Sequence, residues 1–374
     1  MIKSYIWPLG NRISHALMIV FFAAAYLLGD ADELLKYHVI FGFAFGILVL
    51  FRIFWGFAGP KYSKFRDFDL NINSLKKYIG AVFSKGDKHI GHNPASSFAI
   101  ITMFIVAILT ILSGMLAYGV EENHGIFAFL HQANYQEMEI FEELHELFAN
   151  LFLGVVLVHI AGSLMDKFIK KGDAVDSMID GYKMTDTPVG ISTSWWQKIF
   201  QIIWIAISIW FLYYLFATQE NIFVSNYNKP VSYAVLHPEF EAECGSCHIT
   251  YPPFLLPQKS WTAMMENLED HFGDDASLDE ATMVSILRFL EKNSAENSTH
   301  QAAFKITKSL KETNQTVIAI TKTPYWKAKH KEIDSRVFLS NKVKSKANCQ
   351  ACHQDIEKGM LENNLIQLPK GLRT

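Results

Sequence analysis

The sequence predicts an all-α protein in two parts: an integral membrane bundle of helices and a smaller helical domain outside the membrane. Half of the 374 residues are hydrophobic, and the mean hydropathy of +0.12 is too high for an ordinary soluble protein. All four cysteines lie after residue 243, beyond the apolar part of the chain. The small net charge of −3 gives no indication of a nucleic-acid partner.

Five apolar stretches are long enough to cross a bilayer, which takes roughly 17–25 residues of helix. They cover residues 13–29, 37–59, 97–119, 144–165 and 199–217. No small-residue cleavage site follows the first stretch closely, so we interpret it as a retained helix and not as a removed signal peptide.

Basic residues in the loops indicate the orientation, because cytoplasmic loops carry an excess of Lys and Arg. The loops after the second and fourth stretches are rich in lysine, whereas the loop after the third carries several Glu and no Lys or Arg before residue 144. The N-terminus is therefore predicted to be cytoplasmic and everything after residue 217 periplasmic. Trp195 and Trp196 lie where an interfacial anchor of the fifth helix is expected.

The cysteines form two identical frames, CGSCH at 244–248 and CQACH at 349–353. CxxCH is typical of c-type haem attachment, in which two thiols bind the porphyrin and the histidine binds iron. The alternatives are a chance match, a zinc site or a disulfide. They explain two copies of the motif that use every cysteine in the chain less well than haem attachment does. We therefore expect two covalent c haems, on the following residues: Cys244, Cys247 and His248, and Cys349, Cys352 and His353.

Four histidines lie in the membrane stretches, where polar residues are costly and usually functional. Their predicted depths match in pairs: His38 with His145 near the periplasm, and His15 with His159 near the cytoplasm. His145 and His159 are on the same predicted helix, where they lie about 21 Å apart along the axis and close to the same face. Each pair is expected to clamp one non-covalent b haem in a four-helix bundle. The alternative is that one or two of these histidines are interfacial and bond backbone or lipid. Arg52 is a candidate partner for a propionate of the inner haem, and its alternative is to extend to the lipid headgroups.

Two parts of the sequence resemble known families. Residues 1–200 resemble the bacterial cytochrome b561 and hydrogenase-type b subunit superfamily, through the four membrane histidines and FRIFWGFAG (51–59). Residues 236–360 are similar to the dihaem cytochrome c family, through these segments: ECGSCHITYPPFLLPQKSW (243–261), HFGDDASLD (271–279), ITKTPYWKAKHKEI (320–333) and NCQACH (348–353).

The second resemblance implies that each c-haem iron has a second axial ligand from outside the CxxCH frames. We place this role on His271 and His330, which lie inside the matching segments. Sequence proximity pairs His271 with His248 and His330 with His353, although the opposite pairing stays open. The alternative ligands are His237 and four methionines: Met264, Met265, Met283 and Met360.

These observations predict a cytochrome b561-type domain at 1–190, a tethering transmembrane helix at 191–220 and a periplasmic dihaem domain at 221–374, in the bacterial inner membrane. The acidic loop at 119–143 is expected to be a solvated lid or to cap a quinone pocket beside the outer haem. The loop histidines are expected to lie in solvent: His89, His92, His124 and His131.

The resemblance implies electron exchange with the membrane quinone pool. We expect quinol to reduce the b haems, the c haems to receive the electrons and a small soluble periplasmic haem protein to accept them, as in a quinol:cytochrome oxidoreductase. Three alternatives stay open: reverse flow from a periplasmic donor to quinone, superoxide oxidation coupled to quinone reduction, and a redox sensor without enzymatic activity. Membrane lipid is an expected contact, and homodimerisation is left open.

Overall fold

The computed structural model describes residues 1–29, 34–81, 89–130, 140–218, 221–224, 228–311, 316–362 and 365–369. It confirms the all-α prediction and adds one small sheet. The chain forms two compact units, of which the first contains Met1–Leu116 and Ile140–Val224. The second unit contains Ala117–Glu139 and Ser225–Thr374. The domain limits expected from the sequence stay a prediction.

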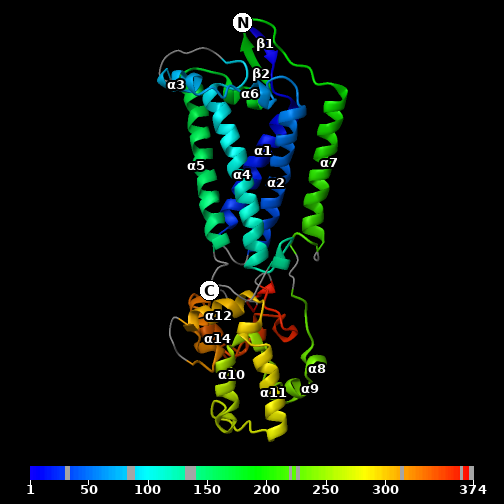
Figure 1. The fold of residues 1–374 in the computed structure, drawn as a ribbon, viewed down its shortest axis with the longest axis vertical. Coiled ribbons are helices and arrows are strands. Elements are labelled where there is room, and N and C mark those ends of the chain that lie inside the picture. The colour runs from blue at the N-terminus through cyan, green and yellow to red at the C-terminus, as the bar shows by residue number, and fades with distance from the viewer. Residues whose placement is uncertain are drawn as a thin grey trace. The chain divides into compact units, whose positions relative to one another are not determined.

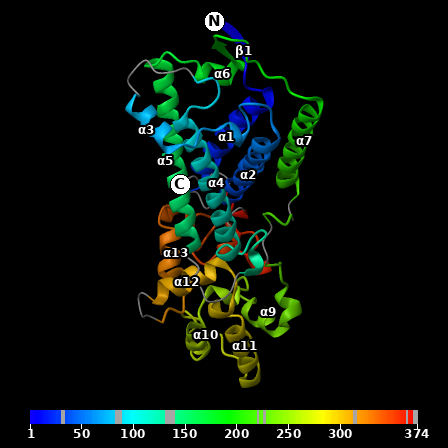
Figure 2. The ribbon, with the colours of Figure 1, turned by 45° about the horizontal axis from the view of Figure 1, so that its top comes forward.

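Five long helices lie side by side in the first unit (Figures 1 and 2). They are α1 (Leu9–Leu28), α2 (Leu35–Ala58), α4 (Pro94–Val120), α5 (Ile140–Phe168) and α7 (Trp195–Ala217). Each has the length and apolar composition to cross a membrane. The five spans predicted from the sequence are thereby confirmed, with ends that differ by a few residues.

Apolar side chains hold the four-helix bundle together. Phe45 and Val49 of α2 pack with Val106 of α4 and Phe152 of α5 in one buried cluster. Helix α7 lies along α2, where the Trp204 indole donates a hydrogen bond of 3.1 Å to the Ile47 carbonyl oxygen. The predicted tether is thus a packed member of the first unit.

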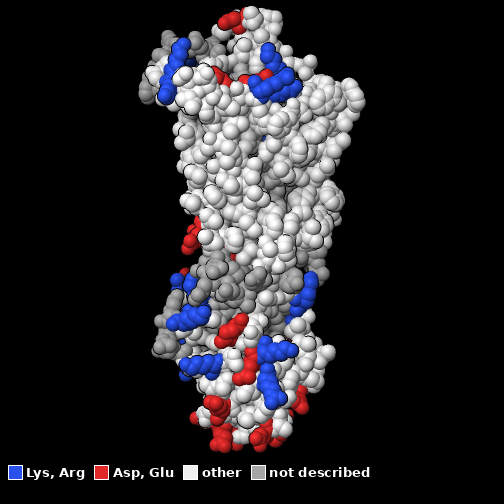
Figure 3. All heavy atoms as spheres, viewed as in Figure 1, with Lys and Arg blue, Asp and Glu red and all other residues white. Residues whose placement is uncertain are grey.

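A two-stranded antiparallel sheet and short helices cover one end of the first unit. Strand β1 (Ile2–Tyr5) pairs with β2 (Tyr182–Thr185), and α3 (Ile72–Gly80), α6 (Ala174–Asp180) and η2 (Phe65–Asp67) lie in the neighbouring connections. Figure 3 shows Lys and Arg side chains, with some Asp and Glu, at this end, while most of the visible surface of the long helices carries no charged side chain.

The second unit is built from short helices around two hydrophobic cores. Its elements are η3 (Ala128–Leu130), α8 (Tyr233–Leu236), α9 (Pro238–Cys244), η5 (Pro253–Leu255), α10 (Gln258–Met265), η6 (Leu268–Asp270), α11 (Glu280–Lys292), η7 (Ala295–Asn297), α12 (Gln301–Lys311), η8 (Ile320–Lys322), α13 (Pro324–Lys329), α14 (Ser335–Phe338), η9 (Cys349–Ala351) and η10 (Ile356–Lys358). Leu256, Ile286 and Leu290 centre one core. Phe254 and Ile306 belong to the other.

Candidate functional site

The inner pair of membrane histidines faces a large cavity. His15 of α1 and His159 of α5 have ring centres 6.3 Å apart. Both rings line a cavity of about 1340 Å³ that also reaches Arg52. Arg52 Nη1 is buried and has no hydrogen-bond partner among the described residues. A buried cation with an unused donor can hold an anionic group of a ligand in this cavity.

The outer pair is held by backbone carbonyl groups. His38 of α2 and His145 of α5 have ring centres 5.8 Å apart. His38 Nδ1 lies 2.8 Å from the Ala25 carbonyl oxygen, and His145 Nδ1 lies 3.0 Å from that of Thr110. Since a carbonyl oxygen can only accept, each Nδ1 carries the proton and each Nε2 is left with a lone pair for a metal.

Two further imidazole pairs lie in the second unit. The ring centres of His248 and His271 are 6.2 Å apart, and those of His330 and His353 are also 6.2 Å apart. His330 Nδ1 donates to the Trp326 carbonyl oxygen at 2.8 Å. Burial lowers the pKa of His353 to about 4, so this imidazole is neutral at physiological pH, the form that binds metals.

Each CxxCH frame is seated on its own core. Cys244 packs against the Leu256 core and Cys349 against the Phe254 core. Burial raises the pKa of both thiols to about 11, so they stay protonated at neutral pH. The two frames are therefore separate sites, each with a nearby second histidine.

The alternative axial ligands have structural roles. His237 Nδ1 accepts a 3.1 Å hydrogen bond from the Phe240 backbone N–H and caps α9. Its Nε2 lies 3.2 Å from the Ser285 hydroxyl, so both ring nitrogens are engaged. The four methionines lie in buried or partly buried apolar packing: Met264, Met265, Met283 and Met360.

Comparison with known families separates the chain into the same two parts. The profile for Prokaryotic cytochrome b561 matches residues 6–181, and the profile for Dihaem cytochrome c matches residues 240–361. The chain belongs to the dihaem cytochrome c family, with a cytochrome b561 part ahead of it.

Named relatives and solved structures match one part each. A probable Ni/Fe-hydrogenase 1 B-type cytochrome subunit of Escherichia coli K12 is 24% identical over 162 residues, which cover 39% of this chain and 68% of that protein. A probable Ni/Fe-hydrogenase B-type cytochrome subunit of Cupriavidus necator is 23% identical, covering 39% of this chain and 65% of that protein. The solved dihaem cytochrome c of Rhodobacter sphaeroides is 38% identical, covering 35% of this chain and 99% of that chain, with a TM-score of 0.30.

The two family memberships give the general function. The fused cytochrome is a multi-pass membrane protein of electron transfer that binds b haem through its first part and c haem through its second. Its described residues include the facing imidazoles that such cofactors need.

The spacing of the imidazoles fits an iron between them. Two metal–nitrogen bonds of about 2 Å, with about 1.2 Å from each nitrogen to its ring centre, separate the ring centres by roughly 6.4 Å. The four pairs are 5.8–6.3 Å apart. The spacing of each pair therefore fits two imidazoles that would hold a haem iron between them.

Glycines beside the b-haem candidates leave open space. A Cβ atom built on Gly42, Gly154 or Gly162 would meet nothing within 4 Å. Gly46 differs, because its Cβ would contact Ile111 at 3.6 Å, which is ordinary helix packing. None of the first three glycines lines the cavity at His15 and His159, and Gly154 and Gly162 are exposed, so the structure gives them no part in holding a haem.

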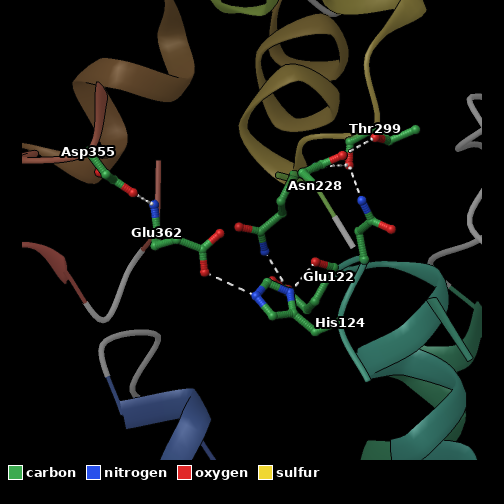
Figure 4. A network of polar contacts seen from close by, with 8 residues as sticks. Glu122, His124, Asn228, Thr299, Asp355 and Glu362 are labelled. Carbon is green, nitrogen blue, oxygen red and sulfur yellow. Dashed lines mark hydrogen bonds and ion pairs between the residues drawn. The ribbon is translucent and has the colours of Figure 1, made fainter. Parts of the chain in front are cut away.

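The structure corrects the expectation that loop histidines lie in solvent. His92 is packed between the rings of Trp7 and Phe68, each 4.8 Å away, and burial lowers its pKa to about 3. His124 is also removed from solvent in part, beside Glu362 (Figure 4). His131 lies outside the described residues. Single loop histidines carry no periodic signal, so these two could not be distinguished from solvated histidines by sequence alone.

Sequence reasoning also missed the residues that position the outer pair. Thr110 and Gly114 of α4 look like ordinary membrane-helix residues. A Cβ on Gly114 would lie 2.7 Å from His145 Cε1, so only glycine lets this imidazole approach α4. The one available signal was the small-residue pair SG at 113–114 in an otherwise bulky stretch.

Proposed function

We propose that this cytochrome carries electrons from membrane quinol through two b haems and two c haems to a soluble periplasmic haem protein. The observation that carries the proposal is the presence of four facing imidazole pairs, two in each unit. The positively charged end of the first unit is assigned to the cytoplasm and the dihaem unit to the periplasm, in the bacterial inner membrane.

The first unit would hold the b haems without covalent bonds. His15 and His159 are assigned to the inner haem and His38 and His145 to the outer haem. Arg52 would donate to a propionate of the inner haem, because its buried Nη1 has no other partner among the described residues. The Ala25 and Thr110 carbonyl groups keep the outer histidines in the tautomer whose Nε2 faces the iron.

The second unit would hold the c haems covalently. Cys244, Cys247 and His248 are assigned to one haem with His271 as its second axial ligand. Cys349, Cys352 and His353 are assigned to the other, with His330. Bound haem iron supplies reversible one-electron storage. The chain's own residues would orient the ligating histidines, exclude water and set the local charge. All three effects tune the reduction potential of a haem.

Anaerobic stopped-flow mixing with quinol tests the proposal. The purified full-length protein in lipid nanodiscs is mixed with decylubiquinol, and the b and c absorption bands are followed separately. We expect the b bands to change first and the c bands to follow. Haem analysis of the same sample should give a b:c ratio of one to one, and another ratio would contradict the four-haem assignment.

A second candidate is flow in the opposite direction, from a periplasmic donor to quinone. It is favoured by the similarity of residues 6–181 to cytochrome subunits named for Ni/Fe-hydrogenases. In the same experiment this direction predicts that quinol leaves the haems oxidised, whereas prereduced protein readily reduces decylubiquinone.

A further inference from the structure

Charge in the second unit is divided between the two CxxCH frames. Residues 236–280, which contain the first frame, carry ten Asp and Glu against one Lys. Residues 320–350, which lead into the second frame, carry seven Lys and one Arg against one Glu and one Asp. The two candidate c-haem sites therefore lie in chain segments of opposite charge.

The acidic segment surrounds His271, the proposed second ligand of the first site. Its carboxylates in and beside the α10–α11 connection are all exposed: Glu266, Glu269, Asp270, Asp274, Asp275 and Asp279. In Figure 3, Asp and Glu gather at the end of this unit where α10 and α11 are joined. A negatively charged protein would be repelled from this site.

Three exposed lysines of the basic segment surround a small hollow. The hollow has a volume of about 230 Å³, and its lining includes the rings of Trp326, His330 and Phe338. Lys346 Nζ lies 5.9 Å from the ring centre of Trp326 and 5.8 Å from that of Phe338. We call the three lysines that line this hollow the lysine rim: Lys327, Lys331 and Lys346.

The hollow lies directly at the second c-haem site. The Trp326 ring stacks on the His330 ring, with centres 4.3 Å apart and planes 14° from parallel. His330 in turn faces His353 of the second frame at 6.2 Å. A protein seated on the lysine rim would therefore lie one side chain away from a proposed iron ligand, and electron transfer requires such proximity.

Carboxylates of the same segment do not cancel this charge. Arg336 Nε donates to Asp334 Oδ2 at 2.9 Å, so the segment's single Asp is paired with its single Arg. Glu332 is then the one remaining carboxylate of residues 320–350, against seven lysines. The two propionates of a bound haem would reduce the excess of positive charge without removing it.

We propose that the lysine rim is the docking surface at which the second c haem passes its electron to a soluble redox protein, whose own haem edge is surrounded by Asp and Glu. The inference rests on the proposed function and deepens it, because it names the exit haem and the charge of the partner. One electron passes from the second c-haem iron to the ferric iron of the partner. The first iron is oxidised as the second is reduced, and no bond forms or breaks.

The division of charge also favours this order of the two sites. Nearby positive charge stabilises the reduced form of a haem, and nearby negative charge stabilises the oxidised form. The acidic segment therefore lowers the reduction potential of the first site relative to the second. Electrons that reach the unit are expected to settle on the second site, beside the lysine rim.

Binding of an acidic haem protein tests the docking surface without measuring activity. The probe is cytochrome b5, and the haem-loaded full-length protein is held in phosphatidylcholine nanodiscs. The double variant Lys327→Glu/Lys331→Glu should bind the probe about tenfold more weakly than the wild type at low salt and lose most of its salt dependence. The neutral variant Lys327→Gln/Lys331→Gln should lie between the two.

The matched control makes the same change of charge elsewhere in the unit. Lys259→Glu/Lys292→Glu alters two exposed lysines outside the lysine rim and should bind cytochrome b5 as the wild type does. All variants should keep the wild-type c-haem spectrum, which shows that they are folded and loaded. Equal weakening in both double Glu variants, or none in either, would overturn the proposal.

The second measurement is the rate at which ferric cytochrome b5 oxidises the c bands. The protein is first reduced with stoichiometric dithionite, so the result does not depend on quinol. Lys327→Glu/Lys331→Glu should slow the second-order rate about tenfold, with the control double variant unchanged. An unchanged rate in the rim variant would overturn the proposal. Failure of quinol to reduce the b haems would instead contradict the proposed function.

Hydrogen–deuterium exchange distinguishes a protein partner from anionic lipid, which lysines also bind. Peptides from 324–346 should exchange equally in nanodiscs of phosphatidylcholine and in nanodiscs that contain phosphatidylglycerol. Addition of cytochrome b5 should slow their exchange in the wild type and leave it unchanged in Lys327→Glu/Lys331→Glu. Slower exchange caused by phosphatidylglycerol alone would assign the lysines to lipid headgroups and overturn the proposal.

Discussion

The two units position imidazole pairs by different means. In the first unit every candidate ligand projects from a transmembrane helix of 20 to 29 residues. In the second unit, the candidates lie in turns or at the ends of helices of seven residues or fewer. Long packed helices fix an imidazole through backbone rigidity, whereas turns depend on local cores and hydrogen bonds.

This difference gives a physical reason to propose covalent attachment in the second unit, which holds all four cysteines, and none in the first. Helix α5 supplies one histidine to each membrane pair. His38 donates to the carbonyl oxygen of Ala25, which lies in the last turn of α1, where carbonyl groups are not needed for bonds within the helix. With a c haem attached, a turn such as 244–248 would gain order from two covalent bonds, which would substitute for helix rigidity.

Removal of a thioether is expected to give the largest effect. Cys247→Ala should lower covalent haem from two to about one per chain, because the first frame retains a single thiol. Intact-mass analysis and haem staining measure this loss. Ser246→Ala, at an exposed neighbouring position, is the control. Two covalent haems in Cys247→Ala would show that the first frame does not need both thiols.

Removal of an inner ligand should affect one b haem and leave the c haems intact. His159→Ala should change the b:c ratio from one to one to about one to two, since the outer pair is roughly 21 Å away along α5. Pyridine haemochromogen spectra give the ratio, and Leu157→Ala, an exposed position on the same helix that does not line the cavity, is the matched control. Loss of both b haems would mean that the two membrane sites are coupled, contrary to the rigid-helix interpretation.

The sequence was sufficient to predict those features that have a periodic pattern or a motif. Apolar length was sufficient for five spans, and charge in the loops indicated which ends share a side. The structure also brings together the residues that were paired by depth, His15 with His159 and His38 with His145. Their roles as iron ligands stay proposals.

What the sequence could not predict depends on contacts between distant segments. The β1–β2 sheet joins strands of four residues each across 180 positions, which leaves no local pattern. His124 is partly buried in contact with Glu362, which lies in an irregular segment far along the chain. His237 resembles a ligand by position, and only its two hydrogen bonds show that it is a cap.

A smaller change in the membrane unit tests how tightly α4 positions the outer pair. Gly114→Ala would put a Cβ 2.7 Å from His145 Cε1 and so displace the imidazole. We expect a shift in the midpoint potential and spectrum of the outer b haem, with the inner b haem unchanged, in a redox titration. Gly80→Ala in α3, where a Cβ meets nothing within 4 Å, should have no effect. Equal shifts in both b haems would argue against local positioning by α4.

The smallest expected effect distinguishes a cap from a ligand in the dihaem unit. His237→Ala removes the acceptor for the Phe240 N–H and should lower the free energy of unfolding of this unit by about 1 kcal/mol, the usual cost of losing a helix N-cap. The c-haem spectrum and potentials should stay as in the wild type, because His271 and His330 face the two motif histidines. Thermal unfolding followed by circular dichroism measures the first quantity, and a redox titration measures the second. His237→Asn, which retains a capping side chain, should recover most of the stability. A high-spin c haem in His237→Ala would instead place this imidazole on an iron and remove one turn histidine from the ligand set.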